Sequence, residues 1–251
     1  MQQQFFPPFD YHILSEIFFT ELMQADSGEK NSLAYVKHIL PKKTLIRDGI
    51  IQGIVIGGTN YITQTQQITG DGSIQILHKD TGKLPIITEK QVLIDFFKAH
   101  FDNRAVAVGL NFGFPMQPLK GLHGAIDSKI IAGTKEHTFA GLIDESLGNL
   151  FRESIKKDGA GAVANDTICL ILSGDGTEQG SMIAGTGFNL GIKKDAEEKT
   201  ILINIEAGNF NQFEPSETLK IIDEQSEKPG AYLFEKMISG KYLATLFDTK
   251  A

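Results

Sequence analysis

The stretch Gly161-Ala162-Val163-Ala164-Asn165-Asp166-Thr167-Ile168-Cys169-Leu170-Ile171-Leu172 sets a polar group between two apolar runs. Asp is a poor residue for the interior of a strand or helix unless a partner or a ligand holds it. The Asp166 carboxylate could accept a hydroxyl proton, and the Asn165 amide could orient a polyhydroxyl substrate. The same pair could also form a plain turn, because Asn and Asp hydrogen-bond to their own backbone. Both readings stay open on this stretch alone.

The composition is that of an ordinary globular protein, with 251 residues, 41% apolar and 22% charged. This length is enough for a sizeable core and for two lobes. The net charge of -7 argues against a nucleic-acid partner. No apolar run reaches the roughly 20 residues that span a bilayer, and the N-terminus does not resemble a signal peptide. The single cysteine, Cys169, lies in an apolar run, and no metal-ligand cluster is visible. We therefore expect a cytoplasmic protein with no membrane partner.

Apolar periodicity on both sides of this stretch predicts helices alternating with strands. We predict helices over 13–23, 32–40, 88–101, 142–155 and 232–247. We predict a β-hairpin over 49–68 and strands over 74–77, 105–112, 128–131, around Ala162 and over 201–206. Residues 168–172 are too few for periodicity to separate strand from helix. Hairpins that alternate with helices indicate an α/β fold with mixed sheets.

Two glycine turns follow β-type runs, at Gly57-Gly58-Thr59-Asn60 and at Gly185-Thr186-Gly187. Bare backbone amides at such turns can approach phosphate oxygens, and a Thr hydroxyl adds a donor. Each turn alone is also what an ordinary hairpin requires. The chain has neither a Walker-type loop nor a dinucleotide-binding Gly-x-Gly-x-x-Gly loop.

A set of polar residues lies at strand ends, in turns or on the first turn of the last helix. Its members are Thr134, Lys135, Asn165, Asp166, Asn189, Glu206 and Glu235. A sugar needs many fixed acceptors and amides, which this set would provide. Taken singly, Lys135 and Glu235 look like solvated surface charges, and only their company indicates a site.

Six blocks in the right order resemble the hexokinases of the eukaryotic glucokinase–hexokinase type. The resemblance as a whole runs from about Ser32 to the C-terminus. The blocks are 110–117, 133–135, Val163-Ala164-Asn165-Asp166-Thr167, Gly185-Thr186-Gly187-Phe188-Asn189, 204–210 and 228–243. The third resembles the family's Val-x-Asn-Asp-Thr element, and the fourth its Gly-Thr-Gly-x-Asn. The last, which contains Met237-Ile238-Ser239-Gly240, is nearly verbatim.

The resemblance implies an actin-like ATPase and sugar kinase fold, which is ribonuclease H-like, with two lobes around a cleft. The small lobe would span 51–163, and the large lobe would combine 1–50 with 164–251 and lack the adenosine-binding part.

The resemblance also implies a role for each site residue. Asp166 would be the general base on the sugar 6-hydroxyl, and Lys135 would hold sugar oxygens and offset negative charge. The remaining hydroxyls would be bound by Thr134, Asn165, Asn189, Glu206 and Glu235. The terminal phosphates of Mg-ATP would be held by Gly57, Gly58, Thr59 and Asn60, with Thr186 assisting.

Several positions depart from the family pattern. Val55 stands where the family has the Asp that serves the metal–phosphate site, and Gly113 replaces a sugar-pocket Ser. From the resemblance we expect a hexokinase-like enzyme that phosphorylates a hexose with Mg-ATP. The alternative is a catalytically impaired homologue that binds sugar and acts as a sensor or interaction protein. We also expect the helix at 232–247 to expose part of its apolar face, which holds Phe234, Met237, Ile238 and Leu246, or to bury it in a homodimer or against a complementing polypeptide.

Overall fold

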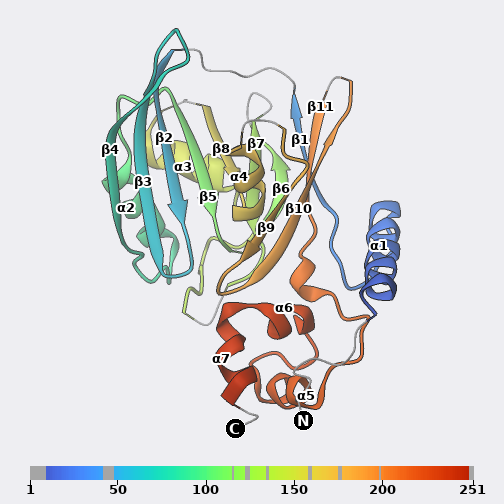
Figure 1. The fold of residues 1–251 in the computed structure, drawn as a ribbon. Helices are drawn as coiled ribbons and strands as arrows, with labels where there is room; N and C mark the ends of the chain where they lie inside the picture. Colours follow the sequence, from blue (N-terminus) through green and yellow to red (C-terminus); the bar gives the residue numbers. More distant parts are fainter. Residues whose placement is uncertain are drawn as a thin grey trace. The chain divides into compact units, whose positions relative to one another are not determined.

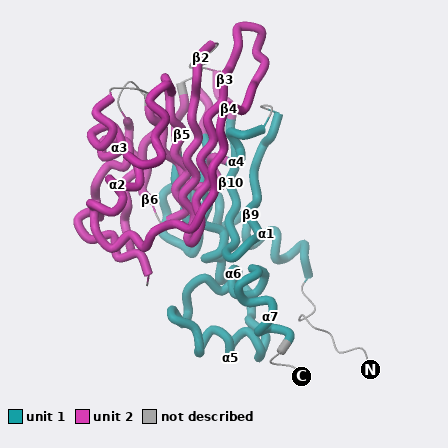
Figure 2. The backbone as a smooth tube through the Cα atoms, turned by 90° about the vertical axis from the view of Figure 1, so that its left-hand side faces the viewer, with its two compact units in different colours: residues 1–37, 170–194, 202–251 teal, residues 38–169, 195–201 magenta. Residues whose placement is uncertain are grey.

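The computed structural model describes residues 10–41, 48–114, 116–121, 125–133, 136–157, 160–174, 177–197 and 199–248. The chain divides into two compact units (Figure 2). Unit 1 comprises residues 1–37, 170–194 and 202–251, and unit 2 comprises residues 38–169 and 195–201. Within the described ranges, no helix is long and apolar enough to span a bilayer.

Unit 2 is built on a five-stranded mixed sheet in the order β4-β3-β2-β5-β8 (Figure 1). Its strands are β2 (Gly49–Ile56), β3 (Asn60–Ile68), β4 (Ile74–Lys83), β5 (Ala107–Phe112) and β8 (Ala160–Ala164). β2, β3 and β4 run antiparallel in sequence, which confirms the predicted hairpin over 49–68 and the strand after it. β5 and β8 run parallel to β2. The carboxyl ends of β2, β5 and β8 therefore meet at one edge of the sheet.

Two helices, α2 (Lys90–His100) and α3 (Leu147–Ile155), pack their apolar faces on this sheet. Ile54, Leu110 and Val163 from the strands share one buried core with residues of both helices. The Ser146 hydroxyl accepts the Asn149 N–H and begins α3 five residues later than predicted. Ile143, which the predicted range 142–155 placed in the helix, lies outside it and is 41% exposed.

The remaining elements of this part of the chain are short. β6 (Met116–Lys120) and β7 (Ile126–Ile130) form an antiparallel pair. α4 (Asp166–Leu172) follows β8 directly, so the ambiguous run after Asp166 is a helix.

A second sheet has four strands in the order β1-β11-β10-β9, and most of its residues belong to unit 1. The strands are β1 (Val36–Pro41), β9 (Gly180–Ala184), β10 (Phe188–Asp195) and β11 (Lys199–Asn204). The helix predicted over 32–40 is wrong, because this segment contains β1. Burial alternates along it with period two, since His38 is buried between exposed Lys37 and Ile39.

The helices of unit 1 are α1 (Tyr11–Ser27), the 3₁₀ turn η2 (Ala207–Asn209), α5 (Glu217–Gln225), α6 (Leu233–Ile238) and α7 (Gly240–Asp248). The Asp10 carboxylate caps α1 by accepting the N–H groups of His12 and Ile13. Phe18 of α1 packs edge-on against Phe210, with ring centroids 5.0 Å apart.

The single helix predicted over 232–247 is wrong, because extended backbone at Ser239 separates α6 from α7. The expected apolar face is therefore split. Of its members, Met237 on α6 is buried, Phe234 and Ile238 on α6 are half-buried, and so is Leu246 on α7. That a second chain covers α7 stays a prediction.

A buried ion pair holds α6 to α5. Lys236 is 1% exposed, and its Nζ lies 2.5 Å from Asp223 Oδ1 and 2.7 Å from the Lys228 carbonyl oxygen. Asp223 also accepts the Gly230 N–H, so this cluster fixes the loop that leads into α6.

Candidate functional site

Three short segments that follow β2, β5 and β8 lie at the carboxyl edge of the five-stranded sheet. We call this group the carboxyl edge, and it consists of residues 57–60, 113–114 and 165–166. Ligands of open α/β sheets bind outside the carboxyl ends of the strands. Two predicted site elements, the Gly57 turn and the Asn165-Asp166 pair, thus lie at the same edge of one sheet in unit 2.

Asn165 and Asp166 form the start of α4. Asn165 Oδ1 accepts the Ile168 N–H at 3.0 Å, as a helix N-cap does. Asp166 Oδ1 accepts the Thr167 N–H at 2.8 Å, which anchors one carboxylate oxygen. Both residues are half-buried, and no other hydrogen bond from a described residue beyond Thr167 is made to the Asp166 carboxylate. Burial, and then the Asp166 charge, raise the pKa of Cys169 to about 12, which favours the protonated thiol.

The Gly57 turn links β2 to β3. The Gly57 N–H donates to the Asn60 carbonyl at 3.0 Å, and a Cβ at Gly57 would lie 3.2 Å from that oxygen. Gly58, Thr59 and Asn60 are exposed. The turn thus presents backbone atoms that a phosphate could approach closely.

His137 holds this turn in place from the other side. Its Nδ1 accepts the Ile87 N–H at 3.1 Å, so the proton of the neutral ring is on Nε2, which donates to the Gly58 carbonyl at 3.0 Å. The ring is 3% exposed and packs on Phe114 and Phe139. His137 therefore fixes the position of Gly58 relative to the segments that contain Ile87 and Phe139.

Asn111 lies beside Val55 on the neighbouring strand. The register pairs Asn111 with Val55 of β2 and with Ala164 of β8, so the three side chains share one face of the sheet. Among the described residues, no group hydrogen-bonds to the buried Asn111 Oδ1. Val55 contributes no oxygen at the position where the resemblance implies a carboxylate, and the adjacent amide oxygen is unsatisfied.

Unit 1 joins Asn189 and Glu206 through a residue that the sequence reasoning missed, Asn204. Asn189 Nδ2 donates to Asn204 Oδ1 at 2.8 Å, and Asn204 Nδ2 donates to Glu206 Oε1 at 2.6 Å. Asn189 Oδ1 accepts the N–H groups of Leu190 and Ala207. Each amide is therefore oriented, and the chain of bonds positions the Glu206 carboxylate.

Glu235 and Tyr232 lie near Glu206. Glu235 Oε2 accepts the Phe188 N–H at 2.9 Å, and a Cβ at Gly187 would lie 2.8 Å from this oxygen. Burial, and then the negative charges of Glu206 and Glu235, raise the pKa of Tyr232. Glu206 and Tyr232 both have left-handed backbone, with φ of 53° and 56°. Tyr232 thus lies within electrostatic reach of both carboxylates in unit 1.

The other predicted residues are placed as follows. Thr186 is exposed on the turn after β9, and the carbonyl of its neighbour Gly185 accepts the Gly240 N–H at 2.7 Å. Thr134 and Lys135 lie outside the described residues. In the part of the chain that is described, no group of three His, Cys, Asp or Glu residues could hold a metal ion.

Sequence reasoning missed Asn204, Tyr232, His137 and Asn111 as parts of these groups. Asn204 had a usable signal, since it stands two residues before Glu206, and alternate residues of a strand share a face. Tyr232 had none, because its position depends on a left-handed turn that only the folded chain shows.

Residues 179–249 match the protein-family model described as Hexokinase. Hexokinase-7 of Oryza sativa subsp. japonica is 24% identical to this chain, and the match covers 89% of this chain and 55% of that protein. Hexokinase-1 of Homo sapiens is 31% identical over 62% of this chain and 19% of its own length. The chain spans about half the length of the rice protein.

Solved structures show the same likeness. A hexokinase from Schistosoma mansoni complexed with glucose superposes with a TM-score of 0.69 at 23% identity, covering 92% of this chain and 59% of that one. A second hexokinase crystal structure gives a TM-score of 0.68 at 21% identity, covering 95% of this chain and 64% of that one. The predicted actin-like sugar kinase fold is confirmed by these neighbours.

Proposed function

Because this chain is related to the hexokinases, we propose that it is a hexokinase-like phosphotransferase that transfers the terminal phosphoryl group of Mg-ATP to the 6-hydroxyl of a glucose-like hexose. The observation that supports this most is the carboxyl edge of unit 2. There the Gly57 turn and the half-buried Asp166 carboxylate follow strands of one sheet, so the groups proposed to bind phosphate and to act as base belong to one unit.

In this proposal Asp166 accepts the proton of the 6-hydroxyl while that oxygen bonds to the terminal phosphorus and the bond to the departing ADP breaks. The amides of the Gly57 turn hold the terminal phosphates, with Thr186 assisting. Lys135 offsets the developing negative charge, and the other sugar hydroxyls are bound by Thr134, Asn165, Asn189, Glu206 and Glu235. When bound with ATP, magnesium would supply positive charge that offsets the phosphates. Val55 has no side-chain oxygen that could bind this magnesium ion. Asp166 supplies the carboxylate of the carboxyl edge.

The second candidate function is sugar binding without efficient transfer, as in a sensor or interaction protein. Val55 favours it, because an apolar side chain stands where a metal-orienting carboxylate is implied, and Asn111 next to it keeps an unsatisfied oxygen. The hydrogen-bonded group of Asn189, Asn204 and Glu206 in unit 1 is by contrast complete.

Glucose titration by calorimetry, run beside a coupled assay of ADP release, separates the two functions. An enzyme binds glucose and releases ADP in a glucose-dependent way. Xylose, which lacks the 6-hydroxymethyl group, should bind without accepting phosphate. Binding without glucose-dependent ADP release selects the second function, and the absence of both activities contradicts the proposal.

We expect Val55→Asp to raise glucose-dependent turnover by about tenfold or more, equivalent to ~1.4 kcal/mol of transition-state stabilisation. The new carboxylate would accept hydrogen bonds from metal-bound water and orient the ion on the phosphates. Placing it among apolar neighbours should lower the free energy of unfolding by about 1–3 kcal/mol. The matched control is Val55→Asn, which has similar shape and no charge. Equal rates for wild type and a folded Val55→Asp variant would show that the metal site does not limit turnover.

A further inference from the structure

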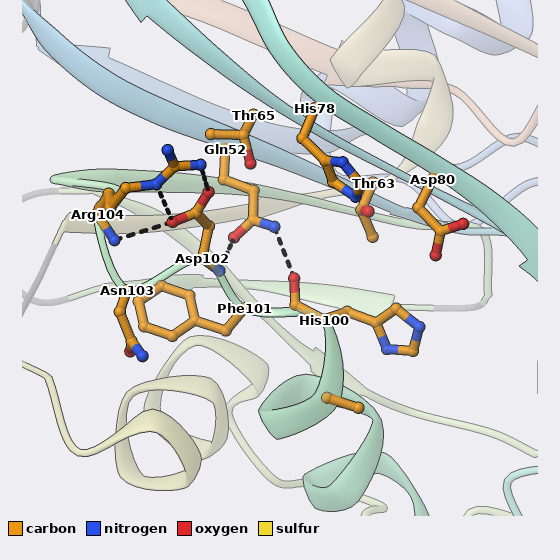
Figure 3. A pocket seen from close by; sticks show the side chains of 11 residues that line it. Gln52, Thr63, Thr65, His78, Asp80, His100, Phe101, Asp102, Asn103 and Arg104 are labelled. Atoms are coloured by element: carbon orange, nitrogen blue, oxygen red, sulfur yellow. Dashed lines mark hydrogen bonds and ion pairs between the residues drawn. The ribbon is translucent and has the colours of Figure 1, made fainter.

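A polar pocket of about 410 Å³ opens in unit 2 beside the end of α2 (Figure 3). We call it the α2 pocket. It is lined by Gln52, Thr63, Thr65, His78, Asp80, Ala99, His100, Phe101, Asp102, Asn103 and Arg104. All of these residues belong to unit 2 and none is part of the carboxyl edge.

Polar side chains of β2 and β3 line the α2 pocket, on the face of the sheet that also holds core residues. Gln52 lies two residues before the core residue Ile54 and faces the same side of β2, yet it is 4% exposed. Thr63 and Thr65 of β3 are 3% and 1% exposed. Burial of a polar group is unfavourable unless it is hydrogen-bonded. The partners of these groups therefore show which part of the pocket is already satisfied.

In one half of the α2 pocket, the lining residues hydrogen-bond to one another. Gln52 Nε2 donates to the His100 carbonyl at 2.7 Å, and Gln52 Oε1 accepts the Asp102 N–H at 2.9 Å. The Arg104 guanidinium donates to both oxygens of Asp102, at 3.0 and 2.7 Å, and lowers the pKa of that carboxyl. In this half the charges of Asp102 and Arg104 offset each other.

The other half keeps unused acceptors. Thr63 lies opposite Asp80 in the pairing of β3 with β4, and within the described ranges no group hydrogen-bonds to its hydroxyl. Asp80 accepts the Tyr61 hydroxyl at 2.9 Å, but no described cation forms an ion pair with it. Figure 3 shows Thr63, His78 and Asp80 on the same side of the pocket, away from the Asp102–Arg104 pair.

His100 adds a further acceptor near Asp80. In its neutral form its Nδ1 donates to the Phe96 carbonyl at 2.9 Å, and no described residue donates to the Nε2 lone pair. The ring packs against Tyr61, with centroids 4.5 Å apart, and Tyr61 is itself bonded to Asp80. This half therefore combines a carboxylate that no described residue pairs with a positive charge and acceptors that carry no charge.

We propose that the α2 pocket binds a small organic ammonium ion through Asp80. A primary ammonium carries a positive charge and three N–H donors, which match one Asp80 oxygen, the Thr63 hydroxyl and the His100 Nε2. A metal ion is a poorer match, because the described residues place no three His, Cys, Asp or Glu side chains together. An anion would be repelled by Asp80, and a neutral alcohol would leave its charge unpaired.

The test titrates the intact chain with ethylammonium, ethanol and acetate while backbone amide NMR shifts are recorded. Ethylammonium is expected to shift the amides of Thr63 and Asp80 in a saturable way, and the other two probes are not. Asp80→Asn should lower ethylammonium affinity at least tenfold, because the amide can still accept the Tyr61 hydroxyl but carries no charge. Asp95→Asn, on the exposed face of α2, makes the same change in net charge outside the pocket and should keep the affinity.

Thr63→Val, which keeps the side-chain shape and removes one acceptor, should lower the affinity less than Asp80→Asn does. The proposal is overturned if ethanol binds as well as ethylammonium, if no probe shifts these amides, or if folded Asp80→Asn binds like wild type. None of these outcomes depends on whether the chain phosphorylates a sugar.

Discussion

Asp166→Asn is expected to reduce glucose-dependent phosphoryl transfer by about 10²- to 10⁴-fold, the range typical of a general base. Glucose affinity should stay within about tenfold of wild type, because the amide keeps the size and planarity of the carboxylate. The fold should also persist, since an Asn oxygen at 166 can still accept the Thr167 N–H. Rates from the coupled ADP assay, with affinities from calorimetry, check both parts.

Asp144→Asn is a matched control for this variant. Asp144 is an exposed aspartate of unit 2 with left-handed backbone, which Asn tolerates well, and it is far more exposed than Asp166. It should keep wild-type transfer. A folded Asp166→Asn protein that retains most of the wild-type rate would show that Asp166 is not the base.

Lys236→Met is expected to lower the free energy of unfolding by about 3–5 kcal/mol, the usual result of removing one partner from a buried ion pair. Lys236 is 1% exposed, and its Nζ contacts both Asp223 and the Lys228 carbonyl. Its removal leaves Asp223 with the Gly230 N–H as its described partner and no compensating charge. Urea denaturation followed by circular dichroism measures the change.

Lys220→Met provides the comparison on the neighbouring helix. Lys220 forms ion pairs with Glu214 and Glu217, but its side chain is 39% exposed, so this change should cost no more than about 1 kcal/mol. Combining Lys236→Met with Asp223→Asn should recover part of the lost stability, because the remaining charge is removed too. Equal losses for Lys220→Met and Lys236→Met would contradict a special role for the buried pair.

The elements that the sequence predicted well have strong local signals. The hairpin over 49–68 combines β-branched strands with glycines at its turn, and both strands are present. β1 was mistaken for a helix because its partner, β11, lies more than 150 residues away, and a run of nine residues holds too little periodicity. The break at Ser239 was missed although Ser239-Gly240 stands there, a pair that is typical of turns and helix kinks.

The position of two elements of the candidate site could be predicted from the sequence. Asp166 and the Gly57 turn stand out as polar or glycine positions between apolar runs, and parallel strands bring them to one edge. The α2 pocket could not be predicted, because Thr63 and Thr65 look like ordinary strand residues. Only the fold shows that they face inward beside Asp80. The roles of the site residues in phosphoryl transfer stay predictions.

The backbone conformation of Glu206 and Tyr232 affects the stability of unit 1. Both hold left-handed backbone without being glycine, a conformation that disfavours an ordinary L-residue by about 1–2 kcal/mol. Glycine at either position would relieve this cost and would also delete the carboxylate or the phenol. Selection for thermal stability alone would therefore favour glycine at both positions and remove these two side chains. The two side chains mark a trade-off in which the protein gives up stability to keep them in place.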